Sequence, residues 1–171
     1  MLKIEVLGSP VLRGECYDVS EFDSSLAKLV NDMFKAMQKA KGVGLAAPQI
    51  GINKRLFVTA APHDENRVFI NPQIVSYSVD MVTLEEGCLS VPGIWCDVKR
   101  PAKIVIKAFD LQGNAFSLKA SGFLARVIQH EYDHLNGKIF TDYGDESVKK
   151  RVLKKFGKGK NFDYLFPSAL Q

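Results

Sequence analysis

The residues best suited to chemistry in this sequence belong to an H-E-x-x-H pattern that begins at His130. Residues 122–136 are expected to form a helix, because their apolar side chains recur at helical spacing. Residues four apart lie on one face of a helix, so His130 and His134 can present two ring nitrogens to one cation. Glu131 lies beside them, where it can act on water at the metal. The pattern therefore predicts a catalytic metal site.

Chance placement explains this pattern poorly. With 3 His and 8 Glu in 171 residues, random order would give about 0.002 such patterns per chain. Two unrelated surface histidines one turn apart are therefore a weak alternative.

The third metal ligand decides the class of protein, because a catalytic metal usually takes three protein ligands and leaves a position for water. Metalloproteases with this helix place the third ligand downstream. In one group of these proteases the third ligand is a histidine six residues after the second, and this chain has Phe140 there. In the other group it is a later glutamate, and the only one here, Glu146, lies in a charged segment. No histidine follows His134. The third ligand must come from upstream.

Three upstream residues could complete the site. His63 lies in a Pro-His-Asp turn of the kind expected at the surface, and Cys96 fits a small buried apolar residue, as most free cysteines are. Cys88 follows Gly87, which frees the backbone just before the thiol. A thiolate is a strong ligand that the metal itself would ionise. The residue types favour Cys88 and leave the other two as alternatives.

The composition is that of a globular protein, with 46% hydrophobic and 25% charged residues among 171. This length fits one domain. No apolar run approaches the roughly 20 residues of a membrane-spanning helix, and residues 1–10 lack the design of a secretory signal. The 3 cysteines are an odd number, which argues against a disulfide framework. We expect a cytoplasmic protein.

Helical and strand patterns occupy different parts of the chain. We expect a first helix over residues 24–41, which Asp23 or Ser24 would cap and Gly42 would end, and a last helix over residues 146–156. Between them lie short β-type runs at 56–58, 68–70, 74–75 and 104–106, separated by turns at 62–64, 71–72 and 112–114. Helices at both ends with strands between them indicate an α+β domain.

Residues 149–160 carry seven basic residues and no acidic one, although the net charge of the chain is only +4. The simpler interpretation is a solvated helix face and a basic tail. The alternative is an electrostatic contact with nucleic acid or a ribosome.

Three segments carry a family resemblance. GVGLAAPQ (42–49), EGCLS (86–90) and QHEYDH (129–134) resemble the three signature motifs of peptide deformylase and follow the same order. Three motifs together are far more specific than one. The resemblance extends to about Phe140, includes the Arg100-Pro101 pair, and shows no departure at a motif position.

This resemblance implies a function and a fold. The enzyme would remove the N-formyl group from the N-terminal methionine of newly synthesised polypeptides and release formate. Residues 1–171 would form one catalytic domain of antiparallel β-sheets around a central helix that carries H-E-x-x-H, with N- and C-terminal helices and a basic tail from about residue 145. Its substrates would be nascent N-formylmethionyl peptides. The basic segment, and not the resemblance, adds a transient ribosome contact to the expected partners, and we expect no membrane and no DNA partner.

The resemblance also assigns roles to residues. Three ligands would hold one metal ion: Cys88, His130 and His134. Glu131 would be the general base. The Gln49 side-chain amide and the Leu89 backbone N–H would stabilise the charge that develops on the formyl oxygen. The implied ion is iron(II), with zinc, nickel or cobalt as substitutes, although two imidazoles and a thiolate also suit zinc.

The methionine side chain needs an apolar pocket, for which Val43, Gly44 and Val127 are the expected walls. Ordinary core packing would explain the same residues. Arg126 interrupts the apolar helix before Val127, and we expect it at the pocket mouth.

Two rival functions are open. A zinc endopeptidase would share the helix motif but needs a downstream ligand. A structural metal module would need a fourth protein ligand, which Cys96 or His63 could supply.

Overall fold

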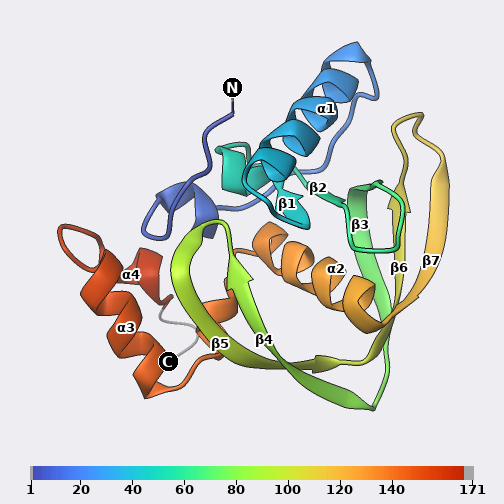
Figure 1. Ribbon diagram of the computed structural model, residues 1–171. Helices are drawn as coiled ribbons and strands as arrows, with labels where there is room; N and C mark the ends of the chain where they lie inside the picture. The colour runs from blue at the N-terminus through green and yellow to red at the C-terminus, as the bar shows by residue number, and fades with distance from the viewer. Residues whose placement is uncertain (1, 168–171) are drawn as a thin grey trace.

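The computed structural model describes residues 2–167, which form three α-helices of two turns or more, seven strands and several short helical turns (Figure 1). The strands are β1 (Gly44–Ala46), β2 (Leu56–Thr59), β3 (Arg67–Tyr77), β4 (Met81–Cys88), β5 (Val91–Pro101), β6 (Lys103–Phe109) and β7 (Ala115–Ser121). The helices are α1 (Ser24–Lys39), α2 (Gly122–Leu135), α3 (Glu146–Phe156) and α4 (Phe162–Leu165), with 3-10 turns at Pro10–Arg13, Ala47–Ile50 and Phe140–Tyr143.

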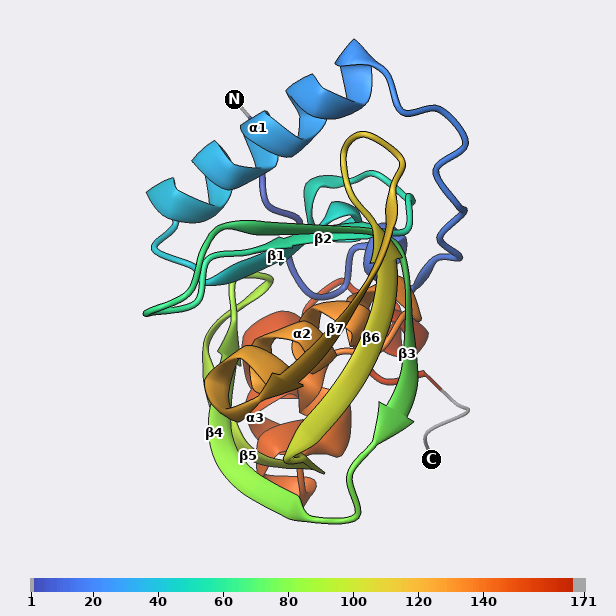
Figure 2. The ribbon, with the colours of Figure 1, turned by 90° about the vertical axis from the view of Figure 1, so that its right-hand side faces the viewer.

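The strands form two separate antiparallel sheets. One has five strands in the order β1-β2-β3-β6-β7, and the other is the long hairpin of β4 and β5. The hairpin curves away from the larger sheet, as Figure 2 shows. The predicted α+β class with antiparallel sheets is confirmed.

Helix α2 lies between the two sheets and carries the H-E-x-x-H pattern (Figure 1). Its apolar side chains, among them Ala125, Ile128 and Leu135, pack against Phe57 and Phe69 of the five-stranded sheet. Gly137 follows the helix with a φ of 68°, a left-handed conformation that glycine adopts without strain. The helix therefore holds its histidines between two layers of structure.

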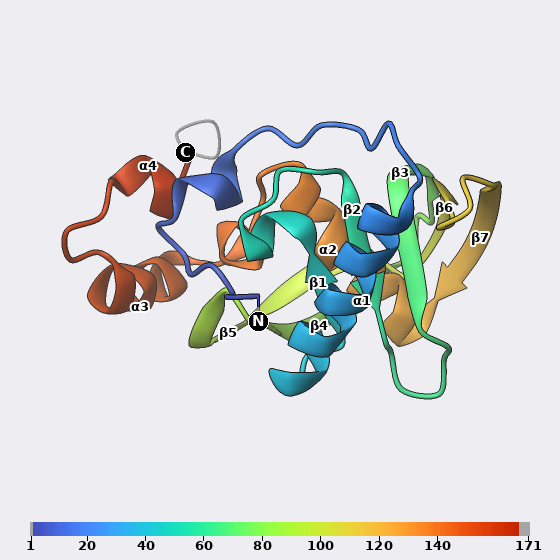
Figure 3. The ribbon, with the colours of Figure 1, turned by 90° about the horizontal axis from the view of Figure 1, so that it is seen from above.

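The outer helices match the expected ones closely. Helix α1 begins after Asp23, whose side chain accepts a hydrogen bond from the Leu26 N–H, and it ends at Lys39 rather than at residue 41. It packs on β1 and β2 through one apolar cluster. Helix α3 has the predicted bounds, 146–156, and lies with α4 at the end of the molecule opposite β7 (Figure 3).

One predicted turn is wrong. Residues 71–72 do not separate two strands, because β3 continues through them with a shift of register between Ile70 and Gln73. Asn71 has a φ of 48°, and its side chain holds both the N–H and the carbonyl of Val19. Pro72 has no N–H for the ladder. A local irregularity, and not a turn, accommodates both residues.

The sequence patterns missed four strands: β1, β4, β5 and β7. Residues 81–85 of β4 are all exposed, so the alternation of apolar and polar side chains that marks a half-buried strand is absent. Pairing with β5 defines this strand instead. None of the helices within residues 2–167 has the length and apolar character needed to cross a bilayer.

Candidate metal centre

Two histidines of α2 and one cysteine of the hairpin come together between the sheets. Cys88 is the last residue of β4, and its Sγ lies 3.3 Å from Nε2 of His134. The rings of His130 and His134 stand nearly edge to face with their centroids 5.3 Å apart. One ligand atom from each of the three residues lies within 4.8 Å of the others. The helix and the hairpin thus each supply part of one ligand set.

This group of three ligands fits a catalytic metal site better than a structural metal site. It offers two imidazole nitrogens and one sulfur, and a catalytic site uses three protein ligands and keeps one position for water. Glu131 is buried, and within residues 2–167 its Oε2 has no hydrogen-bond partner. A buried carboxylate oxygen without a partner is costly unless a ligand or substrate satisfies it.

The alternative ligands lie elsewhere. Cys96 is buried in the cluster that also holds Val98 and Phe140, and burial raises the pKa of its thiol to about 11. His63 occupies an exposed turn and has a φ of 63°. Neither residue belongs to the group around Cys88.

A buried carboxylate, Glu86, orients His130. Its Oε2 accepts a hydrogen bond from Nδ1 of His130 at 2.8 Å, which leaves Nε2 of that ring free to face Cys88. Arg100 donates from Nε to Oε1 at 2.6 Å and from Nη2 to Oε2 at 3.0 Å. Arg126 donates to Oε1 at 2.9 Å. These four bonds fill the roughly four acceptor positions of a carboxylate, so Glu86 is held rigidly.

Burial and charge shift the pKa values of this region in opposite directions. Burial alone would raise the pKa of Glu86, but hydrogen bonds from His130 and Arg100 outweigh it and lower that pKa well below its ordinary range. Burial raises the pKa of Glu131 to about 7. Burial and the charge of His130 keep the pKa of His134 well below its ordinary value. Burial alone would lower the pKa of His130, but its hydrogen bonds to Cys88 and Glu86 raise that pKa well above the ordinary value. A metal therefore meets a neutral His134 and must displace a proton from His130.

Gln49 is fixed beside the sulfur. Its Oε1 accepts from the Ala46 N–H at 2.8 Å, and its Nε2 donates to Ser90 Oγ at 3.1 Å and to Cys88 Sγ at 3.4 Å. Only 1% of Gln49 is exposed. Leu89 lies in the turn between β4 and β5, next to Cys88. A donor with a fixed position, such as this amide, is what stabilisation of a developing oxyanion requires.

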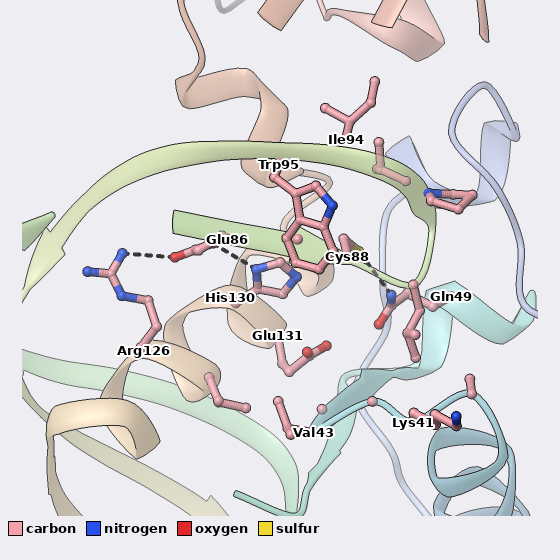
Figure 4. A pocket seen from close by; sticks show the side chains of 18 of the residues that line it. Lys41, Val43, Gln49, Glu86, Cys88, Ile94, Trp95, Arg126, His130 and Glu131 are labelled. Carbon is pink, nitrogen blue, oxygen red and sulfur yellow. Dashed lines mark hydrogen bonds and ion pairs between the residues drawn. The ribbon is translucent and has the colours of Figure 1, made fainter. Parts of the chain in front are cut away.

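A cavity of about 490 Å³ opens over these residues (Figure 4). Gln49, Cys88, Leu89, His130 and Glu131 all line it. The expected pocket residues do so as well: Val43, Gly44 and Val127.

The mouth and the wall of the cavity differ in exposure. Trp95 and Phe123 are 56% and 50% exposed, and they mark its open side. Arg126 also lines the cavity, but it is only 7% exposed and belongs to the buried wall, not to the mouth as expected. The ring of Trp95 packs on Gly87 so closely that no Cβ would fit there.

Comparison with known proteins decides the family. A model of the polypeptide deformylase family matches residues 1–150. The chain belongs to the peptide deformylase family. A peptide deformylase of Pseudomonas aeruginosa is 45% identical over 160 residues, which cover 92% of this chain and 95% of that protein.

Solved peptide deformylases share the fold as well as the sequence. The structure from Synechococcus elongatus in complex with actinonin has a TM-score of 0.89 and 39% identity, and the match covers 97% of this chain and 92% of that one. The Legionella pneumophila structure has a TM-score of 0.85 and 44% identity, with coverage of 92% and 96%. Peptide deformylases are metal-dependent hydrolases that remove the N-formyl group from nascent peptides, and the Cys/His/His group is consistent with this activity.

Sequence reasoning missed the supporting residues of this deformylase site. In the sequence, Glu86 and Arg100 stand out only as parts of motifs, and Arg126 only as an interruption of an apolar face. A metal-bound histidine usually donates its other N–H to a carboxylate or a carbonyl, so some partner for His130 could have been expected. The sequence offers 19 acidic residues and no means of choosing among them.

Proposed function

We propose that Cys88, His130 and His134 hold one iron(II) ion, at which the chain deformylates nascent N-formylmethionyl peptides. The observation that carries this proposal is the convergence of the three ligand atoms beside the unpartnered Glu131 Oε2, at the base of a cavity. Iron rests on the family resemblance, because the donor set suits zinc as well. When bound, such a dication acts as a Lewis acid and lowers the pKa of water toward neutrality.

Glu131 would act as general base and then as general acid. Its carboxylate lines the same cavity as Cys88 and His130, where it would take a proton from the attacking water. It would return this proton to the amine that leaves when the C–N bond of the formamide breaks. The products are formate and a free N-terminal methionine.

Gln49 and Leu89 would stabilise the oxyanion. The two N–H groups of Gln49 Nε2 donate to Ser90 Oγ and to Cys88 Sγ, so a formyl oxygen would accept the N–H that now points to the sulfur. Removing one donor of this kind costs about 2.7–4 kcal/mol of barrier stabilisation in comparable sites.

Val43, Gly44 and Val127 would accept the methionine side chain. All three line the cavity, and Val127 is buried on the face of α2 that also bears His130. Strand β1, which begins at Gly44, is an edge strand of the larger sheet. An extended peptide can bind along such an edge through its main chain.

We also propose that residues 1–171 act as one domain, that the enzyme works in the cytoplasm, and that basic residues near the C-terminus contact the ribosome transiently. In support, α3 and α4 pack into the same apolar cluster as β5. The exposed face of α3 and the turn after it present six basic side chains: Lys150, Arg151, Lys154, Lys155, Lys158 and Lys160. Residues 168–171 of the expected tail lie outside the described part of the chain.

The deciding experiment measures formate release from a formyl-methionyl peptide by protein prepared without oxygen, together with its metal content. We expect release of formate only from the formylated peptide and about one iron per chain. Internal cleavage of formylated and unformylated peptides alike would contradict the proposal and favour a zinc endopeptidase.

A further inference from the structure

Arg126 is a buried cation that connects the two halves of the centre. It lies one helical turn before His130 on α2, and its Nη1 donates to the Val98 carbonyl at 2.6 Å. Its Nη2 donates to the Val82 carbonyl at 2.7 Å. Val82 belongs to β4 and Val98 to β5, so one side chain of the helix binds both strands of the hairpin. That hairpin carries Cys88.

The third bond of Arg126 reaches the carboxylate that orients a histidine. Nη1 also donates to Glu86 Oε1, while Oε2 of the same carboxylate accepts from His130. Arg126 therefore restrains His130 through Glu86, in addition to restraining the hairpin.

Arg126 supplies the second positive charge for two carboxylates, Glu86 and Asp133, that share Arg100. Arg100 alone makes a two-point ion pair with Glu86, and its Nη1 pairs with Asp133 at 2.7 Å. A buried guanidinium costs free energy unless it is fully bonded, and the neighbours of Arg126 on the helix, Val127 and Ile128, are apolar. Beyond its charge, Arg126 adds the link to the two hairpin carbonyls, which Arg100 does not make.

We propose that Arg126 is a positioning residue that sets the distance between the Cys88 sulfur and the imidazoles of His130 and His134. The ligands of this centre lie on two elements that are joined by no disulfide and are 42 residues apart at their closest (88 to 130). Packing alone leaves the spacing of such elements adjustable, whereas three directed bonds from one planar guanidinium fix it. The inference rests on the proposed metal centre.

The test uses cobalt(II) as the probe in three full-length variants. Arg126→Met keeps the aliphatic stem but removes the hydrogen-bond donors. Arg126→Lys keeps the positive charge but lacks the planar guanidinium that can bond three acceptors at once. Arg151→Met is the matched control, because Arg151 also donates to a β5 carbonyl, that of Trp95 at 3.1 Å, but from the exposed face of α3. The readouts are the sulfur-to-cobalt absorption band and the rate of cobalt release to a chelator, with folding followed by circular dichroism.

We expect Arg126→Met to shift the absorption band and to release cobalt about 10-fold faster than the parent. This is the lower end of the effect of losing a direct partner of a metal ligand, because Arg126 acts on His130 through Glu86. Arg126→Lys should lie between the two, and Arg151→Met should match the parent. Equal spectra and release rates in Arg126→Met and the parent would overturn the inference. If Arg126→Met does not fold, the same comparison with Arg126→Lys decides.

The experiment distinguishes failure of the metal centre from failure of the positioning role of Arg126. If the parent shows no sulfur-to-cobalt band, the Cys88 centre itself is wrong. If the parent shows the band and the Arg126 variants leave it unchanged, the centre stands and only the positioning role is lost.

Discussion

Gly44 of β1 and Glu131 of α2 touch each other with no space left for a side chain on the glycine. A Cβ on Gly44 would lie 2.8 Å from Cγ of Glu131 and would also contact its carboxylate. Such an approach is well inside van der Waals contact, so any larger residue at position 44 has to displace Glu131. The backbone of β1 therefore decides where the proposed general base lies.

We expect Gly44→Ala to lower kcat by about 100-fold, because a displacement of a catalytic group by about 1 Å has effects of that size. Metal content should stay at the parental level, since no ligand lies in that contact. Steady-state kinetics with a formyl-methionyl peptide and metal analysis measure both. Ser147→Ala is the control, because Ser147 is exposed on α3 and does not line the cavity. Unchanged kcat in Gly44→Ala would show that Glu131 tolerates the shift.

Glu131→Gln should retain metal and lose nearly all turnover. The amide has a similar shape but accepts no proton, and general acid–base catalysis contributes about 10²–10⁴-fold. The measurement is kcat at equal metal occupancy. Activity within tenfold of the parent would remove Glu131 from the role of base.

The cysteines should differ in their effect on the metal. Cys88→Ser is expected to lose the ion, since its sulfur lies within the ligand group. Cys96→Ser should keep one ion per chain, because Cys96 points into an apolar cluster and its Sγ approaches only the Phe140 carbonyl at 3.9 Å. Metal per chain, measured after gel filtration, separates the two. The reverse pattern would favour a structural metal module.

Substrate entry can be followed through Trp95, the only tryptophan in the sequence. Its ring is half exposed and lines the open side of the cavity. A product peptide that begins with methionine should shift the emission of Trp95 to shorter wavelength, because binding removes water from the ring. A peptide that begins with glycine should have much less effect at the same concentration, and Trp95→Phe should abolish the signal. Equal shifts with both peptides would argue against an apolar methionine pocket in this cavity.

Arg13 joins the N-terminal segment to the C-terminal one. It makes a two-point ion pair with Asp142, and both side chains are at most 6% exposed. It also donates to the carbonyls of Gly137, Tyr164 and Leu165. Arg13 therefore links the N-terminal segment to the segment that follows α2 and to α4.

Arg13→Met should lower the free energy of unfolding by about 3–5 kcal/mol, because it leaves Asp142 buried without its charge partner. Urea titration followed by circular dichroism measures this loss. Arg13→Met combined with Asp142→Asn should recover part of it. A loss below 1 kcal/mol in the single variant would mean that water reaches Asp142 when Arg13 is absent.

The sequence by itself determined the chemistry available to this protein. Two histidines four residues apart on a helix must share a face, because the α-helix repeats every 3.6 residues, and this local rule made His130 and His134 a pair before any tertiary contact was known. The motif around Cys88 and the order of the three motifs then pointed to the family. Helices α1, α2 and α3 were also predictable, because their apolar residues follow the same local period.

Only the tertiary structure decided how the two halves of the site meet. The hairpin of β4 and β5 has an exposed outer strand with no strong pattern, so its pairing, and with it the position of Cys88, depends on contacts far apart in the sequence. The same holds for Glu86, whose partners Arg100, Arg126 and His130 come from two other elements. Bonds between side chains that are distant in the sequence leave no periodic pattern in it. The metal ligands could therefore be named from the sequence, whereas the residues that hydrogen-bond to them could not.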